Sequence, residues 1–286
     1  MTTSAALSSA PAVVAPTSPH HSPGSQSSSA PGFLTAVGVE ILKMRRLRAP
    51  QITMLIVGTS VALCSMSLFS ASFTESSHDP HAMPWARLLL TTGFFNAMIG
   101  PILVSVLASR QTDIEHTGSG WNLAAASGLT PGTLCRAKLV ALSLLIVPAV
   151  TGQSLGIITL ARCRGLSVAL DVGPWATYTT LLICVDLATC AYFLWLAAVV
   201  ENQLIVMSTG LLSGFIGIFT LLVPPEIVRW TPWYYALITP AARSASTGSQ
   251  TAVTYIDVPA GWIAGFLILT VLLFTVVTHR LDKIER

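Results

Sequence analysis

The stretch at residues 181–223, "LLICVDLATCAYFLWLAAVVENQLIVMSTGLLSGFIGIFTLLV", decides the fold of this chain. It contains two apolar runs, and each approaches the roughly 20 residues that a helix needs to cross the hydrocarbon core of a bilayer. Only the polar triplet "ENQ" around Glu201 separates them. We therefore predict two membrane-spanning helices, at about 174–199 and 203–223, joined in a tight hairpin.

Four more apolar runs of similar length lie elsewhere in the chain. We place them at about 51–72, 85–109, 138–161 and 259–278. The composition agrees, because 52% of the residues are hydrophobic and only 9% are charged, whereas soluble domains carry about 25% charged residues. The sequence predicts an all-α integral membrane protein with six transmembrane helices. Its net charge of +3 is too small to indicate a nucleic-acid partner.

The distribution of lysine and arginine predicts the orientation in the membrane. An even number of spans places both termini on one side, and cytoplasmic loops carry more Lys and Arg than outer loops. With the N-terminus inside, the cytoplasmic set is Lys43, Arg45, Arg46, Arg48, Arg110, Arg136, Lys138, Arg280, Lys283 and Arg286. The outer set is Arg87, Arg162, Arg164, Arg229 and Arg243. We expect a multi-pass protein of the plasma membrane with both termini in the cytoplasm.

The chain before the first span divides into two parts. Residues 1–32 are rich in Ser, Pro and Ala, and such a segment buries too little apolar surface to fold, so we expect a disordered cytoplasmic tail. The domain at 33–286 begins with a predicted amphipathic helix at 33–48, whose apolar residues recur at helical spacing and whose end is basic. Its basic residues are Lys43, Arg45, Arg46 and Arg48. This helix is expected to lie among anionic lipid headgroups, an interpretation compatible with an ordinary basic flank.

The segment at 110–137 is the longest predicted cytoplasmic connection. Its acidic pair, Asp113 and Glu115, is expected in the first turn of a helix, where the helix dipole favours negative charge. A short helix over "WNLAAASGL" is expected to end near Gly128. It presents Trp121 either to a protein partner, since Trp is a frequent interface anchor, or simply to the lipid headgroups.

The predicted outer loop at 224–258 combines prolines with aromatic residues. The prolines exclude one continuous helix. Its interface-seeking aromatic residues are Trp230, Trp233, Tyr234 and Tyr235. We expect short, partly re-entrant helices that cap the outer face, since irregular backbone at membrane depth must be covered by protein or water.

No motif for catalysis or metal binding stands in the context that it requires. The sequence contains no phosphate-binding GxxxxGK[ST] and no HExxH, and its GxSxG match at 152–156 lies inside a predicted span and not at the strand-to-helix turn of a nucleophile elbow. Its five cysteines form no CxxC pair, so we expect neither a zinc site nor a cofactor bound by this chain, and no enzyme. Asp186 is the one acid inside a predicted span. It is either a carboxylate on a transport path or a neutral, hydrogen-bonded acid that packs helices.

Small residues recur four apart in two of the predicted spans. Gly210 and Gly214 lie in the fifth span, and Gly152 and Gly156 lie in the third. Such faces let helix backbones approach closely. The contact is expected either within one chain or between two chains.

The order of these features resembles the permease subunits of type-2 ATP-binding-cassette (ABC) exporters, and most closely the bacteriocin-immunity permeases. The resemblance covers about 33–286. It is carried by the basic segment "VEILKMRRLRAP" before the first span and by a loop after the second span. That loop runs from Glu115 through "HTGSGW" and "NLAAASGLTPGTLCRAK" to Lys138. The chain departs from the family at "SGLTPG", where Pro-Val-Ser-Arg is frequent, and in its long Ser/Pro-rich tail.

The resemblance implies an ATP-driven exporter of amphipathic peptides or drugs. A separate cytosolic ABC ATPase would hold ATP and magnesium, and a second permease chain would complete the path, with Gly210 and Gly214 at the seam between chains. The residues implied to contact the ATPase are Glu115, His116, Gly118 and Trp121. The alternative is a membrane scaffold or sensor that recruits a cytosolic partner, and a membrane enzyme dependent on Asp186 comes third.

Overall fold

The structure is a computed structural model that describes residues 32–70, 73, 77–220, 223, 227, 235, 237–244 and 252–284. In this part of the chain, helices form nearly all of the regular structure. They are α1 (Phe33–Arg46), α2 (Ala49–Met66), α4 (Pro84–Thr117), α5 (Gly120–Ala126), α6 (Pro131–Cys163), α7 (Val172–Val199), α8 (Gln203–Thr220) and α10 (Ala260–Ile284). Two short 3₁₀ helices, Ser67–Phe69 and Pro80–Ala82, and two strands, β1 (Ala241–Ser244) and β2 (Ala252–Tyr255), complete the regular elements.

Six of these helices are long and apolar enough to cross a membrane, which confirms the predicted number of spans. They are α2, α4, α6, α7, α8 and α10. The chain therefore has the architecture of a multi-pass membrane protein. The predicted hairpin between α7 and α8 is also confirmed, since only residues 200–202 separate the two helices.

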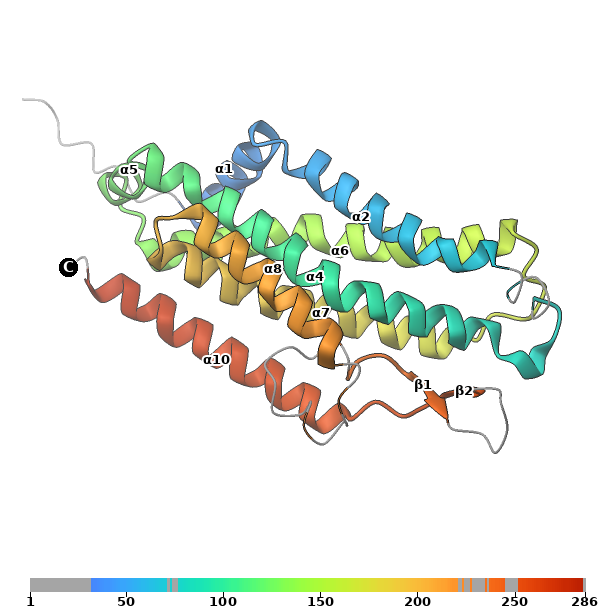
Figure 1. Cartoon of the computed structure of the whole chain (residues 1–286). Helices are drawn as coiled ribbons and strands as arrows, with labels where there is room; N and C mark the ends of the chain where they lie inside the picture. The colour runs from blue at the N-terminus through green and yellow to red at the C-terminus, as the bar shows by residue number, and fades with distance from the viewer. Residues whose placement is uncertain are drawn as a thin grey trace, which may run out of the picture.

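The six long helices form one bundle (Figure 1). Helix α4 is its central element and packs against α2, α7 and α8, whereas α6 packs against α2, α7, α1 and α10. Helix α10 lies at the edge of the bundle and buries very little of its surface. Figure 1 places α1, α5 and the C-terminal end of α10 at one end of the bundle, and β1 and β2 at the other. Helix α1, with its basic last turn, thus lies at the same end as α5.

Both helices that flank the 110–137 segment extend further into it than the sequence indicated. Helix α4 continues to Thr117 and α6 already begins at Pro131, so that the connection between them contains only α5 and its short links. The expectation that Asp113 and Glu115 begin a helix is therefore wrong. They lie in the last two turns of α4, because the polar residues at 110–117 continue its backbone hydrogen bonding past the apolar span.

Local backbone chemistry sets the ends of the short elements. Arg48, with φ of 56°, interrupts the helical backbone between α1 and α2. Pro50 fits the first turn of α2, where no backbone donor is needed. Gly128, with φ of 80°, follows the end of α5, a conformation that glycine adopts without steric cost. The predicted short helix ending near Gly128 is thereby confirmed.

The connection between α8 and α10, predicted as an outer loop, contains a pair of strands, and most of the segment expected to form short capping helices lies outside the described residues. Its residues 241–244 and 252–255 form an antiparallel pair of strands, β1 and β2, in which Ala241 is paired with Tyr255. The sequence analysis predicted no strand in this region. Tyr235 is buried in the bundle, whereas Trp230, Trp233 and Tyr234 lie outside the described residues.

The glycines of α8 pack within the chain. A Cβ added at Gly210 would meet the side chain of Ser105, and one at Gly214 would meet the carbonyl oxygen of Met98, both on α4. This face is therefore occupied, and the expectation that Gly210 and Gly214 lie at a seam between two chains is corrected. By contrast, Gly152 on α6 has no neighbouring atom within 4 Å of an added Cβ.

Gly214→Ala is expected to destabilise the protein by about 1–3 kcal/mol, the usual cost of overpacking. The added methyl group has backbone for a neighbour and must push α8 away from α4. Thermal unfolding in detergent measures the effect, with Gly152→Ala as the matched control, which should be neutral or stabilising because its site is open. Equal stability of the two variants would contradict the close α4–α8 contact.

Candidate functional site

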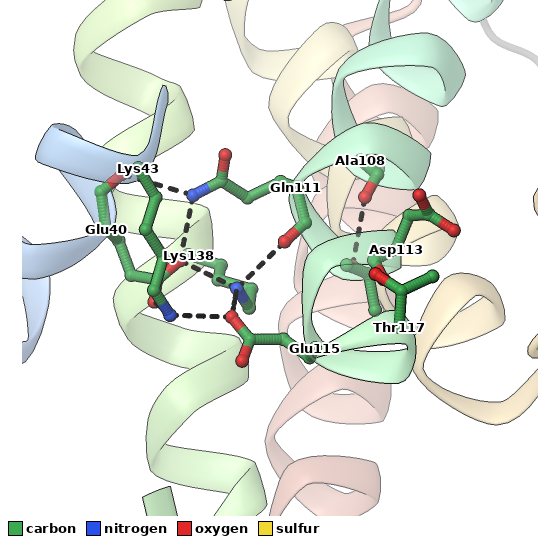
Figure 2. A network of polar contacts seen from close by, with 9 residues as sticks. Glu40, Lys43, Ala108, Gln111, Asp113, Glu115, Thr117 and Lys138 are labelled. Carbon is green, nitrogen blue, oxygen red and sulfur yellow. Dashed lines mark hydrogen bonds and ion pairs between the residues drawn. The ribbon is translucent and has the colours of Figure 1, made fainter. Parts of the chain in front are cut away.

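A cluster of buried charged side chains joins three helices at the end of the bundle that carries α5. Glu40 and Lys43 come from α1, Gln111 and Glu115 from the end of α4, and Lys138 from the start of α6 (Figure 2). We call these five residues the ion cluster. Its members are up to 98 positions apart in the sequence, so the cluster fixes α1 against the two longest helices of the bundle.

Lys138 is the central cation of the ion cluster. Its Nζ donates to Glu40 Oε2 at 2.7 Å, to Glu115 Oε1 at 2.7 Å and to the carbonyl oxygen of Gln111 at 2.9 Å. A lysine ammonium has three donors, and all three are used. Glu40 and Lys138 are fully buried and Glu115 is 2% exposed, so that no solvent replaces these contacts.

Lys43 completes the neutralisation of the two acids. Its Nζ donates to Glu40 Oε1 and to Glu115 Oε1, each at 2.7 Å. Burial lowers the pKa of Lys43, but its hydrogen bonds to Glu115 and Glu40 outweigh that effect and hold the pKa above its ordinary value. Two lysines thus balance two glutamates, which is the condition under which buried charges are tolerated.

Gln111 closes the remaining side of the ion cluster. Its Nε2 donates to Glu40 Oε2 at 2.8 Å and to the carbonyl oxygen of Glu40 at 3.2 Å. Glu40 therefore accepts hydrogen bonds from three side chains, although its helix, α1, is not one of the six long helices of the bundle. The polar contacts hold α1 in one orientation, since each oxygen of the Glu40 carboxylate has its own cation.

The ion cluster is in direct contact with α5. Glu115 Oε1 receives both lysines, and Glu115 Oε2 lies so close to Gly120, the first residue of α5, that an added Cβ would collide with it. His116 Nε2 lies 2.9 Å from the carbonyl oxygen of Ala197 at the end of α7. Its ring also meets Trp121 edge to face, with centroids 5.9 Å apart. Glu115 and His116 of α4 thus hold the start of α5, and α7 in turn contacts His116.

The four residues predicted to contact an ATPase separate into a buried and an exposed group. Glu115 is buried in the ion cluster, where its carboxylate accepts hydrogen bonds from Lys43 and Lys138. Its expected place at a docking surface is therefore corrected. Gly118 is exposed, and His116 and Trp121 are partly exposed. Leu123 of α5, which the sequence analysis did not single out, is 69% exposed.

The four predicted basic residues of the first helix also separate. Arg45, Arg46 and Arg48 are exposed, whereas Lys43 turns inward to the ion cluster. The predicted apolar face turns inward too, since Val37 and Met44 are buried. These residues were expected to lie in the headgroup layer. The structure packs them against the bundle and leaves Leu34 and Leu42 exposed instead.

Glu40 and Gln111 are the members of the ion cluster that sequence reasoning missed. A signal for Glu40 was present, because it lies three residues after Val37 and four before Met44 and therefore shares their buried face. An acid on such a face requires a cation, and Lys138 was named only as the residue that enters the third span. Nothing in the sequence pointed to Gln111.

Asp186 lies apart from the ion cluster, near the middle of α7. It is buried, and Tyr235 Oη donates to its Oδ1 at 2.6 Å. Gly100 of α4 allows this contact, because an added Cβ there would lie 2.6 Å from the Tyr235 ring. Among the described residues, no lysine or arginine forms an ion pair with Asp186, and no three His, Cys, Asp or Glu side chains gather to hold a metal.

Similarity to known proteins adds nothing to this geometry. No model of a protein family matches the chain, and no curated protein matches it either. The functional assignment therefore depends on the membrane architecture, on the ion cluster and on the exposed helix α5.

Proposed function

We propose that this chain is the membrane subunit of an ATP-driven exporter of the ABC type and that α5 docks on a separate cytosolic ATPase. Two permease chains, identical or paralogous, form the transport path for an amphipathic substrate in the plasma membrane. The end of the bundle that carries α1, α5 and the C-terminus faces the cytoplasm. ATP and magnesium are held by the ATPase, and this chain supplies the path.

The observation that carries the proposal is that α5 is exposed, whereas the ion cluster against which it begins is buried. Helix α5 buries none of its residues and presents Leu123 and part of Trp121 outward. Its first residue nevertheless lies against Glu115 of the ion cluster. An exposed short helix on a rigid, charge-paired base is suited to receive a push from a partner and to pass it to α1, α4 and α6.

The exposed surface of α1, which contributes Glu40 and Lys43 to the ion cluster, supports the same proposal. Its exposed apolar residues and its basic end suit the surface of a membrane with anionic lipids. An element on the membrane surface and an element exposed to the cytosol are thereby joined at the same end of the bundle. This is the arrangement that the resemblance to exporter permeases implied.

Purification from native membranes in mild detergent, with mass spectrometry of the bound proteins, tests the partner. We expect a soluble ATPase with its own nucleotide-binding motif, together with one or two permease species. The chain alone should not hydrolyse ATP, and the complex should. Recovery of the chain with a kinase or another regulator would instead favour the scaffold or sensor function.

Trp121→Ala combined with Leu123→Ala is expected to weaken ATPase co-purification by at least about tenfold, since aromatic anchors often contribute 2 kcal/mol or more at interfaces. The bundle should still fold, because α5 buries none of its residues and the substitution removes only the ring contact of Trp121 with His116. The matched control is Trp262→Ala, which removes a half-exposed tryptophan at the other end of the bundle. ATPase binding that survives the double substitution would refute docking through α5.

A further inference from the structure

Helix α1 presents a surface that fits a membrane with anionic headgroups. Its outward apolar side chains include Leu34, which is 82% exposed, and Leu42, which is 64% exposed. Arg45 and Arg46 follow in its last turn and are exposed as well. In the part of the chain that the structure describes, no ion pair involves either of these two arginines. Their charge is free for phosphate groups.

The opposite face of α1 leads to α5 through three consecutive contacts. Glu40 is bound to Lys138 at 2.7 Å, Lys138 is bound to Glu115 at 2.7 Å, and Glu115 lies directly against Gly120 of α5. Figure 2 shows the first two contacts between the ribbons of α1, α6 and α4. All three side chains are buried, so a displacement of α1 cannot be absorbed by solvent around them.

We propose that anionic phospholipid at α1 controls the position of α5 through the ion cluster. Phosphate groups that bind Arg45 and Arg46 hold α1 at the membrane surface and keep Glu40 on Lys138. Lys138 then keeps Glu115 beneath Gly120, which orders α5. The proposal rests on the proposed function only in naming α5 as the element that docks on a partner.

The coupling is reciprocal by thermodynamic necessity. If anionic lipid orders α5 for docking, then a partner bound to α5 strengthens the attachment of α1 to anionic lipid by the same factor. The protein would therefore dock its partner best in an anionic leaflet. A neutral bilayer would leave the same chain folded but less ready to dock.

Hydrogen–deuterium exchange of the purified chain in lipid nanodiscs tests this inference. The nanodiscs contain phosphatidylcholine alone or phosphatidylcholine mixed with phosphatidylglycerol. We expect peptides covering 118–130 to exchange about fivefold more slowly with the anionic lipid, which corresponds to the lower end of ordinary allosteric coupling. Equal exchange of these peptides in the two lipid mixtures would overturn the proposal.

Two variants then locate the coupling. Arg45→Gln with Arg46→Gln should abolish the lipid response at 118–130, whereas Arg280→Gln with Lys283→Gln, on exposed residues at the end of α10, should preserve it. A response that survives the loss of both α1 arginines would mean that lipid acts elsewhere and would overturn the proposal.

The double variant Glu40→Gln with Lys138→Met tests the ion cluster itself. It removes one acid and one base and leaves the pair of Lys43 and Glu115 at 2.7 Å. Lipid should still slow exchange in 33–46, but the response at 118–130 should fall to what the direct contact of Lys43 with Glu115 transmits. An undiminished response at 118–130 would overturn the assigned route through Lys138. Gly120→Ala, which displaces Glu115 itself, should abolish the response at 118–130 and serves if the double variant fails to fold.

This experiment contains no ATPase and is therefore independent of the exporter assignment. A lipid response in a chain that co-purifies with no ATPase would leave the coupling standing and refute the exporter. A chain that binds its ATPase but shows no lipid response would support the exporter and refute the coupling.

Discussion

Lys138→Met is expected to lower the free energy of unfolding by about 3–5 kcal/mol, the usual cost of removing one partner from a buried ion pair. The substitution keeps the length of the side chain but removes the cation that Glu40 and Glu115 share. Lys43 alone then faces two buried carboxylates. Unfolding of the purified protein by denaturing detergent, followed by the fluorescence of its tryptophans, measures the loss.

The reason for the loss is tested by removing an acid as well. Lys138→Met with Glu40→Gln should regain a large part of the stability, because the remaining Lys43 and Glu115 neutralise each other and because apolar or neutral replacements of a whole buried pair are often tolerated. Lys283→Met, on an exposed lysine, is the control and should change little. A double variant no more stable than Lys138→Met would show that the loss does not come from the unbalanced charge of Glu40.

The six spans could be predicted from the sequence because membrane length and apolar composition are local properties. Helices α7 and α8 follow directly from two apolar runs around Glu201. Helices α4 and α6 are longer than the predicted spans at 85–109 and 138–161, since the residues at 110–117 are polar and carry no apolar pattern. Only the continuous hydrogen bonding of the backbone reveals that α4 reaches Thr117.

The ion cluster could not be predicted in the same way because its partners are chosen by tertiary packing. Lys43 belongs by sequence to a basic run with Arg45 and Arg46, and nothing local distinguishes the lysine that turns inward. Its partner Glu115 lies 72 residues away. An acid within an apolar helical face, as at Glu40, was the one usable signal that a buried cation would be found.

The glycines of α8 show a different limit. Gly210 and Gly214 correctly indicated a close helix contact, but a glycine requires only that some backbone come near. Sequence spacing is identical whether that backbone belongs to the same chain or to another. The position of Met98 on α4 decides the matter here, and it is fixed by the fold of the whole bundle.

Tyr235→Phe is expected to destabilise the protein by about 1–3 kcal/mol, the cost of leaving a buried polar group without its partner. The hydroxyl of Tyr235 is the donor that the structure gives to Asp186, at 2.6 Å. The phenylalanine ring still fills the space beside Gly100, so packing is nearly unchanged. The matched control is Tyr255→Phe, which removes a hydroxyl from β2, at the end of the bundle opposite α5, and should have little effect on unfolding.

Asp186→Asn separates the two interpretations of this acid. The amide oxygen can still accept from Tyr235, and no described cation loses an ion pair. We therefore expect the variant to unfold within about 1 kcal/mol of the native protein, the net value of a typical hydrogen bond. Export in reconstituted vesicles should then match that of the native complex if Asp186 only anchors Tyr235 between α4 and α7. Normal stability with export lost would instead make the carboxylate part of the transport path, since the hydrogen bond that holds the fold would be intact.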